Sequence, residues 1–170
     1  MILLGIGSNL ESIYGDRFKN IDLSIAALNG YGIQVKNKSS YYESPSYPDK
    51  TKPKFINVVV DVETHLPPID LASVLLFIEE SLGRKREVKN DPRTCDIDII
   101  DYNNQTINFK YNNSNFVVPH EKLVYRSFVL FPIKEIYPNW KHPKTNELVT
   151  TLIDNLPKDD KNSILKINKY

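Results

Sequence analysis

Phe55-Ile56-Asn57-Val58-Val59-Val60-Asp61-Val62-Glu63 is the stretch that decides the fold of this chain. Successive side chains of an extended strand point to opposite faces, so Ile56 and the even-numbered valines share one face. The other face carries Phe55, Asn57, Val59 and Asp61. The alternation predicts a long strand over 55–63. The amide of Asn57 needs a hydrogen-bond partner among these β-branched neighbours, and a bound ligand is a natural candidate.

Strands and helices alternate on both sides of this strand. Upstream, the apolar spacing predicts a strand over 2–6, a helix over 16–28 and a strand over 33–42. Downstream, Pro67-Pro68 begins a helix over about 69–82 that Gly83 ends, and a strand follows over 96–102. Two strand–helix–strand units predict a split βαβ, ferredoxin-like α+β sandwich. We expect a mainly antiparallel sheet with helices packed on one face, which leaves the other face free to build a site.

The remaining segments predict smaller elements. The proline-rich segment 44–54 is expected to be a mobile loop, and the polar tail 157–170 is expected to fray. Other expected elements are a hairpin turn at Asn103-Asn104 into a strand over 106–109, a short strand over 116–118, and helices over 125–136 and 148–156. No repeat or low-complexity linker divides the chain, so residues 1–170 are expected to form a single domain.

Composition narrows the classes of function. The 170 residues are 41% hydrophobic and carry a net charge of +1, which argues against a generic nucleic-acid or membrane-surface binder. Cys95 is the only cysteine, so a disulfide framework and a zinc cluster are excluded and a reducing compartment fits. The apolar N-terminus is too short for a signal peptide. We expect a cytoplasmic protein that works as a monomer, without nucleic-acid or membrane partners.

Asp96-Ile97-Asp98 is the sharpest chemical feature. Residues two apart in a strand share a face, with Cα atoms roughly 6.6 Å apart, so the two carboxylates could clamp one or two hard cations that bridge to phosphate oxygens. Asp101 is out of phase with the pair and should point elsewhere. Such a pair also occurs on solvated strand edges.

The use of arginine favours the metal–phosphate interpretation. Only five of the 22 basic residues are arginine, and four of them, Arg84, Arg86, Arg93 and Arg126, lie between positions 84 and 126. The guanidinium fork grips phosphate in a bidentate manner that an ammonium cannot match. Arginines beside a carboxylate pair could also be structural ion pairs, but their concentration here predicts a magnesium–polyphosphate site.

The run Asp91-Pro92-Arg93-Thr94-Cys95-Asp96-Ile97-Asp98 closely resembles the Pro-Arg-x-x-Asp-Ile/Leu-Asp signature of the 6-hydroxymethyl-7,8-dihydropterin pyrophosphokinases, which are folate-pathway enzymes. Further similar segments follow in matching order: Gly7-Ser8-Asn9, Phe55-Ile56-Asn57, Val118-Pro119-His120 and Arg126-Ser127-Phe128. The resemblance implies that the pyrophosphoryl group of ATP is transferred to the hydroxymethyl oxygen of the pterin and that AMP is released.

The same resemblance implies roles for single residues. Asp96 and Asp98 would hold two Mg²⁺ ions, and Arg84 and Arg93 would neutralise the phosphates, so these four form the expected catalytic set. Nucleotide contacts are expected from Glu79, Arg84, Arg93, Ile99, His120 and Arg126. Pterin contacts, with aromatic rings sandwiching the pterin and Asn57 binding its polar edge, are expected from Ser44, Pro45, Tyr47, Phe55, Asn57 and Phe128. Without the resemblance, Glu79 could be a solvated helix carboxylate, His120 a loop histidine and Phe128 a core residue.

The sequence also departs from the family pattern. The loop between Gly83 and Pro92 is one residue short and carries Lys89-Asn90 where many members have Arg-Trp, and Asn115 replaces a frequent basic residue. Pro45-Ser46-Tyr47 replaces a Pro-Leu-Gly-like run, although Tyr47 could supply a ring. We expect these differences to affect rate and affinity rather than the type of reaction.

Two other functions share part of this evidence. A magnesium-dependent nucleotide transferase with a different acceptor would keep Asp96, Asp98 and Arg93 but would not need Asn57. A non-enzymatic ferredoxin-like module that binds RNA or a protein would show exposed aromatic rings on a basic sheet, which the near-neutral charge disfavours.

Overall fold

Six strands form one antiparallel sheet in the computed structural model, which describes residues 1–84, 92–112 and 114–168. Their order is β5-β1-β4-β3-β8, and β2 pairs with β4 outside this path. Their bounds are Ile2–Ser8 (β1), Gln34–Lys38 (β2), Tyr41–Ser44 (β3), Phe55–Glu63 (β4), Asp96–Tyr102 (β5) and Leu165–Ile167 (β8). With helix α1 (Arg17–Gly30) after β1 and α2 (Pro68–Ser81) after β4, this order confirms the ferredoxin-like α+β fold.

Local signals place the ends of the two central helices. The side chain of Asp16 accepts a hydrogen bond from the backbone N–H of Lys19 and caps the start of α1. Pro68 stands in the first turn of α2, where its missing N–H costs nothing. Gly83 follows the end of α2 with φ of 88°, a left-handed conformation that glycine adopts without strain.

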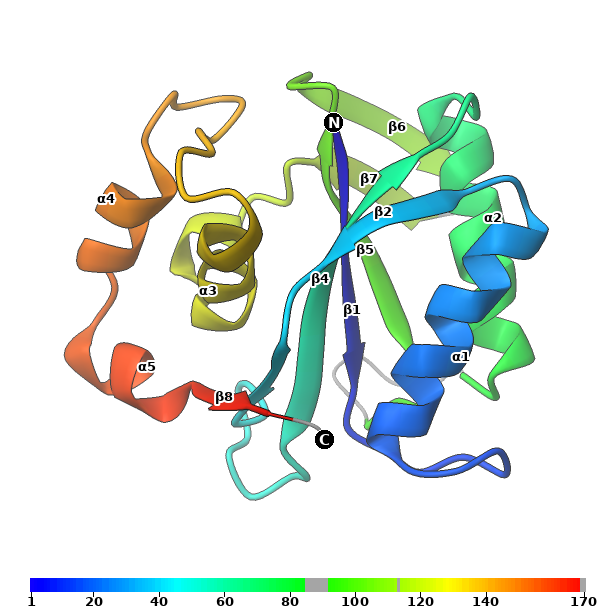
Figure 1. Cartoon of the computed structure of the whole chain (residues 1–170), viewed down its shortest axis with the longest axis horizontal. Helices are drawn as coiled ribbons and strands as arrows, with labels where there is room; N and C mark the ends of the chain where they lie inside the picture. Colours follow the sequence, from blue (N-terminus) through cyan, green and yellow to red (C-terminus); the bar gives the residue numbers. More distant parts are fainter. Residues whose placement is uncertain (85–91, 113, 169–170) are drawn as a thin grey trace.

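The sheet is covered on both faces (Figure 1). Helices α1 and α2 pack on the face that carries Leu4, Val58 and Ile97. On the opposite face, Leu3, Val59 and Ile100 pack against α3 (Ser127–Ile136) and α4 (Val149–Asp154). The expectation of helices on one face was therefore incomplete: α3 and α4 cover part of the second face. Leu3 and Leu4 are both fully buried, as a continuous apolar run requires when it lies between two layers.

Two expected connections differ in the structure. The strand expected over 33–42 is divided at Ser39, whose hydroxyl accepts a hydrogen bond from the N–H of Val59, so β2 and β3 are separate. Asn103 and Asn104 have positive φ angles, as in a tight turn, but the hairpin expected across that turn was wrong. Strand β6 (Ile107–Tyr111) pairs with β7 (Ser114–Val118) instead of β5, and Phe109 stacks on Phe116 with ring centroids 5.2 Å apart.

Part of the C-terminal segment that was expected to fray has regular secondary structure. Residues after 157 form α5 (Lys158–Ser163) and then β8, whose backbone pairs with β3. A short 3₁₀ helix, η1 (Leu123–Tyr125), precedes α3 and shortens the helix expected over 125–136. Within the described ranges, no helix has the length and apolar character needed to cross a membrane.

The apolar cluster between the second face of the sheet and helices α3 and α4 is a second core. Leu130 tests its contribution to stability, because this side chain is fully buried between α3 and the sheet. We expect Leu130→Ala to lower the free energy of unfolding by about 2–5 kcal/mol, through lost burial and the cavity that remains. Leu165→Ala is a matched control, because Leu165 is 57% exposed, and its effect should stay below about 1 kcal/mol. Denaturant unfolding of both variants measures the difference, and similar losses would contradict a tightly packed second core.

Candidate active site

Gly5 and Gly7 of β1 lie on the second face of the sheet, next to the acidic pair Asp96 and Asp98. They form the floor of the candidate site. Gly7 pairs with Asn57 on β4 and with Asp96 on β5, while Gly5 pairs with Asp98. Paired residues of antiparallel strands point to the same face, so Asn57, Asp96 and Asp98 share it. A side chain at Gly7 would begin 3.2 Å from Oδ1 of Asn57. The missing side chain therefore keeps the space above this amide open.

Asp96 accepts hydrogen bonds from two arginines. Nη1 of Arg84 lies 2.5 Å from its Oδ1, and Nη1 of Arg93 lies 2.8 Å from its Oδ2. Nη1 of Arg84 also lies 2.6 Å from Oε1 of Glu79. Burial lowers the pKa of Arg84, but the charges of Asp96 and Glu79 outweigh it and hold the pKa above its usual value. Arg84 therefore stays a cation in a fixed position.

Glu79 is a buried anchor and not a solvated helix carboxylate. Glu79 is 1% exposed, and its Oε1 accepts a hydrogen bond of 2.7 Å from the N–H of Ile97. The carboxylate thus ties α2 to β5 directly beside Asp96. Such a buried charge persists only with partners, and here it has a backbone donor and a guanidinium.

Asp98 is the more accessible member of the acidic pair. Nη1 of Arg126 lies 3.5 Å from its Oδ2, and 49% of its side chain is exposed. Neighbouring atoms exclude part of its hydration and Asp96 adds a like charge, so the pKa of Asp98 is raised to about 6 against the opposing effect of the arginines. A cation that reached this carboxylate would relieve that repulsion.

The acidic pair fits magnesium held together with phosphates. Both carboxylates lie on one face, and the exposed one is open to a cation. Across the described part of the chain, no cluster of three or more His, Cys, Asp or Glu side chains could hold a metal ion. The remaining ligands would come from phosphate oxygens and water, which is how proteins usually hold Mg²⁺.

His120 and Arg126 lie beside the pair. Nδ1 of His120 accepts a hydrogen bond of 3.0 Å from the N–H of Lys122, which leaves the ring proton on Nε2. Burial and the charges of Arg126 and Lys122 lower the pKa of His120, so the ring is neutral at pH 7. Nη2 of Arg126 lies 3.4 Å from Nε2. The N–H groups of His120 and Arg126 therefore lie close together, where both could donate hydrogen bonds to one anion.

The amide of Asn57 is oriented by β3. Its Nδ2 donates to the backbone carbonyl of Tyr42 at 3.3 Å and to the hydroxyl of Ser44 at 3.0 Å. Both amide hydrogens are used, so Oδ1 is left as an acceptor above Gly7. The rings of Phe55 and Phe128 each lie near a guanidinium, with Arg93 at 5.9 Å and Arg126 at 5.7 Å from the ring centroids. Phe128 also packs against the second core.

Other residues expected in the site lie differently. The side chain of Ile99 packs into the core under α1 and α2, away from the face of Asp98. Tyr47 is 78% exposed, and Pro45 is only partly buried in the same loop. Arg86 and the Lys89-Asn90 segment lie outside the described residues.

Asn9 is a positioning residue to which the sequence analysis gave no role. It is 2% exposed, and its Oδ1 accepts a hydrogen bond of 2.7 Å from the N–H of Arg93. Its Nδ2 donates to the hydroxyl of Ser46 at 3.2 Å and to the carbonyl of Pro53 at 3.0 Å. Asn9 thus joins the segment that carries Arg93 to the loop before β4. The position of this polar residue directly after the buried strand β1 could have indicated its role.

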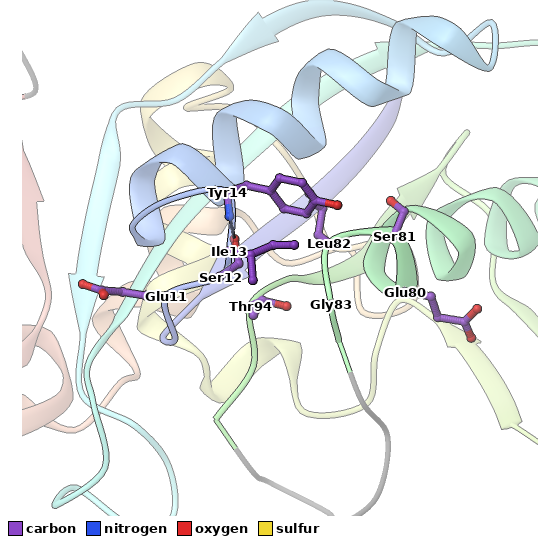
Figure 2. A pocket seen from close by; sticks show the side chains of 9 residues that line it. All are labelled: Glu11, Ser12, Ile13, Tyr14, Glu80, Ser81, Leu82, Gly83 and Thr94. Atoms are coloured by element: carbon purple, nitrogen blue, oxygen red, sulfur yellow. Dashed lines mark hydrogen bonds between the residues drawn. The ribbon is translucent and has the colours of Figure 1, made fainter.

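A separate pocket of about 490 Å³ lies between the segment after β1 and the end of α2 (Figure 2). It is lined by residues 11–14, 80–83 and Thr94, and none of the expected site residues is among them. The carboxylates of Glu11 and Glu80 point away from it in Figure 2. The acidic pair and its arginines therefore form a site of their own.

Comparisons with known proteins identify the family of the chain. The family model for 7,8-dihydro-6-hydroxymethylpterin-pyrophosphokinase (HPPK) matches residues 3–138. The 2-amino-4-hydroxy-6-hydroxymethyldihydropteridine pyrophosphokinase of Synechocystis sp. is 34% identical over 153 residues, which cover 89% of this chain and 74% of that protein. The enzyme of the same name from Bacillus subtilis is 34% identical over 78% of this chain and 75% of its own length.

Some similar proteins are much longer than this chain. The folic acid synthesis protein fol1 of Pneumocystis carinii is 33% identical over 96% of this chain, which spans 21% of that protein. The crystal structure of Plasmodium falciparum HPPK-DHPS with pteroate has a TM-score of 0.70 at 14% identity, over 89% of this chain and 43% of the other. At that identity the likeness concerns the fold alone.

The raised pKa of Asp98 predicts how metal binding depends on pH. Above about pH 6 the carboxyl is ionised and can bind a cation, and below it a proton competes. We expect the affinity for Mn²⁺ with a non-hydrolysable ATP analogue to fall by up to about tenfold per pH unit below that value. Titration by electron paramagnetic resonance between about pH 5 and about pH 8 measures it. Asp98→Asn should bind Mn²⁺ more weakly and lose this dependence, whereas an equal dependence in both proteins would contradict the assignment.

Proposed function

The chain belongs to the 7,8-dihydro-6-hydroxymethylpterin-pyrophosphokinase family, and from this premise we propose how its residues carry out the reaction. It is an enzyme that transfers the pyrophosphoryl group of ATP to the hydroxymethyl group of 6-hydroxymethyl-7,8-dihydropterin, a step of folate synthesis. The observation that carries the proposal is the acidic pair with its arginines on the same sheet face as Asn57. We further propose that the chain works as a single-domain monomer in the cytoplasm.

The part of the site that would bind phosphate contains two arginines held in place by their neighbours. Asp96 and Asp98 would hold two magnesium ions, which would supply positive charge to offset that of the phosphates. Arg84 is fixed by Glu79, and the backbone of Arg93 is fixed by Asn9. Both guanidiniums therefore present a preorganised positive field to the transferring group, which lowers the barrier without a costly rearrangement.

The nucleotide contacts include direct and indirect roles. His120, with its proton on Nε2, and Arg126 would donate to phosphate oxygens of ATP. Glu79 acts through Arg84, since its carboxylate is buried beneath that side chain. Ile99 would contact the nucleotide through its backbone, because its side chain lies in the core.

The acceptor half uses Asn57 and aromatic rings. Oδ1 of Asn57 would accept hydrogen bonds from N–H groups on the pterin edge, because both hydrogens of its amide are already used by Tyr42 and Ser44. Phe55 and Phe128 would stack on the pterin ring, and Pro45 and Tyr47 would cover it from the loop 45–54. This arrangement favours a flat heterocycle with adjacent donors over other acceptors.

The transfer needs alignment more than proton chemistry. The hydroxymethyl oxygen attacks the β-phosphorus of ATP, the bond between that phosphorus and the oxygen of AMP breaks, and the hydroxyl proton passes to solvent. AMP leaves with the bridging oxygen and the pterin keeps both transferred phosphates. Positioning and charge neutralisation supply most of the acceleration in such reactions.

The nature of the nucleotide product tests this function. Incubation of the protein with ATP, Mg²⁺ and 6-hydroxymethyl-7,8-dihydropterin should form AMP and pterin diphosphate in equal amounts, which chromatography with mass detection measures. Omission of the pterin should abolish AMP formation. Formation of ADP instead, or no product from protein that circular dichroism shows to be folded, would refute the proposal.

Arg93→Lys tests the need for a guanidinium fork. The charge is kept, but the bidentate grip on phosphate is lost, so we expect kcat to fall by about 100-fold or more. The backbone bond between residue 93 and Asn9 remains, and the melting temperature should change little. Turnover within about threefold of the wild type would count against a phosphate role for this side chain.

A further inference from the structure

Strand β8 lies beyond residues 3–138, which the family model matches. It nevertheless completes the sheet next to the acceptor half of the site (Figure 1). Lys166 stands opposite Tyr42, so the four-residue strand β3 is held between β4 on one side and β8 on the other. Without β8, β3 would be a short edge strand with unpaired backbone groups.

Glu135 of α3 gathers donors from both of these strands. Its Oε2 accepts from the hydroxyl of Tyr42 at 2.9 Å and from the N–H of Ser40 at 3.1 Å. Its Oε1 accepts from the hydroxyl of Ser40 at 2.7 Å and from Nζ of Lys166 at 3.1 Å. One carboxylate therefore connects helix α3, the start of β3 and strand β8.

The network keeps a single protonation state. Partial burial raises the pKa of Glu135, but hydrogen bonds from Ser40, Lys166 and Tyr42 outweigh it and hold the pKa below its usual value. Burial and the bond to Glu135 raise the pKa of Tyr42. At neutral pH the carboxylate is charged and the phenol is protonated, so the bond between them persists.

The same strand orients the acceptor amide. The carbonyl of Tyr42 and the hydroxyl of Ser44 receive both hydrogens of Asn57, and Tyr42 is also its backbone partner on β3. Phe128 lies seven residues before Glu135 on α3, about two helical turns away on the same side of the helix. Glu135 connects α3 to Ser40 and Tyr42, so loss of these bonds would let β3 move relative to α3, the helix that carries Phe128.

We infer that Glu135 and Lys166 are positioning residues for the pterin acceptor, acting through Tyr42 on Asn57. The inference rests on the proposed function, since that function assigns Asn57 and Phe128 to the pterin. Arg84 and Arg93 are held by Glu79 and Asn9 instead, so the nucleotide half should be little affected. The C-terminal strand, outside the segment matched by the family, thus supports specific recognition of the acceptor.

Kinetics of full-length variants test the inference. We expect Glu135→Gln to raise the KM for the pterin by about tenfold, while kcat and the KM for ATP stay within about twofold. Lys166→Ala should raise it by about threefold only, because the side chain of Lys166 is 49% exposed, and Lys166→Arg should restore it. The dissociation constant of the pterin, measured by fluorescence with a non-hydrolysable ATP analogue present, should rise in parallel.

Lys161→Ala is the matched control. Lys161 also lies in the C-terminal segment, but its Nζ donates to the carbonyl of Asp154 and not to Glu135. This variant should leave both KM values unchanged. A lower melting temperature of the Glu135 and Lys166 variants with an unchanged pterin KM and dissociation constant would show a purely structural network and overturn the inference. If the wild type forms no AMP, the proposed function fails and the inference fails with it.

Discussion

The antiparallel register of β1 between β4 and β5 is the constraint on which both the core and the site depend. Its first half places Leu3 and Leu4 under opposite helical layers, so the strand is buried on both faces. Its second half places Gly5 and Gly7 opposite Asp98, Asp96 and Asn57. Moving the register by one residue would turn every one of these side chains to the other face. The same pairing therefore stabilises the domain and assembles its polar groups.

The charged groups of the site are positioned by a buried carboxylate, that of Glu79. Glu79 is a carboxylate buried beside a backbone N–H and a guanidinium, and it holds Arg84 against Asp96. A buried charge of this kind contributes little net stability, because desolvation offsets much of the attraction. Its value lies in geometry: Arg84 is already in place before phosphate arrives. Asp98, by contrast, keeps an accessible carboxylate whose pKa of about 6 leaves it ionised at neutral pH, as its proposed role in binding a cation requires.

Local patterns predicted the features that depend on local physics. Clean alternation predicted β4 with its observed bounds, and strand parity placed Asp96 and Asp98 on one face of β5. Parity also placed Asp101 out of phase with the pair, which was wrong. The register shift between Leu3 and Leu4 pairs Asp101 with Leu3, so it lies on the second face as well, where its Oδ2 accepts a hydrogen bond from Trp140. The second helical layer, the β6–β7 pairing and the ordered C-terminal strand were missed, since each depends on contacts between distant segments. The buried partners of Glu79 and Asn9 were likewise not predicted, because a polar residue in a sequence does not reveal which distant groups it contacts.

Gly7 has a consequence for how this protein can evolve. A Cβ there would lie 3.2 Å from Oδ1 of Asn57, so the amide would have to move by a few tenths of an ångström. The ring of Phe55, at 3.5 Å, would be in ordinary van der Waals contact. A substitution at Gly7 would therefore disturb the amide of Asn57, which the proposed function assigns to the pterin. Tyr47, in the loop before β4, is 78% exposed, so a substitution there would disturb fewer neighbours. A ligand that rests on this floor would contact a position at which even a methyl group changes the surroundings of Asn57.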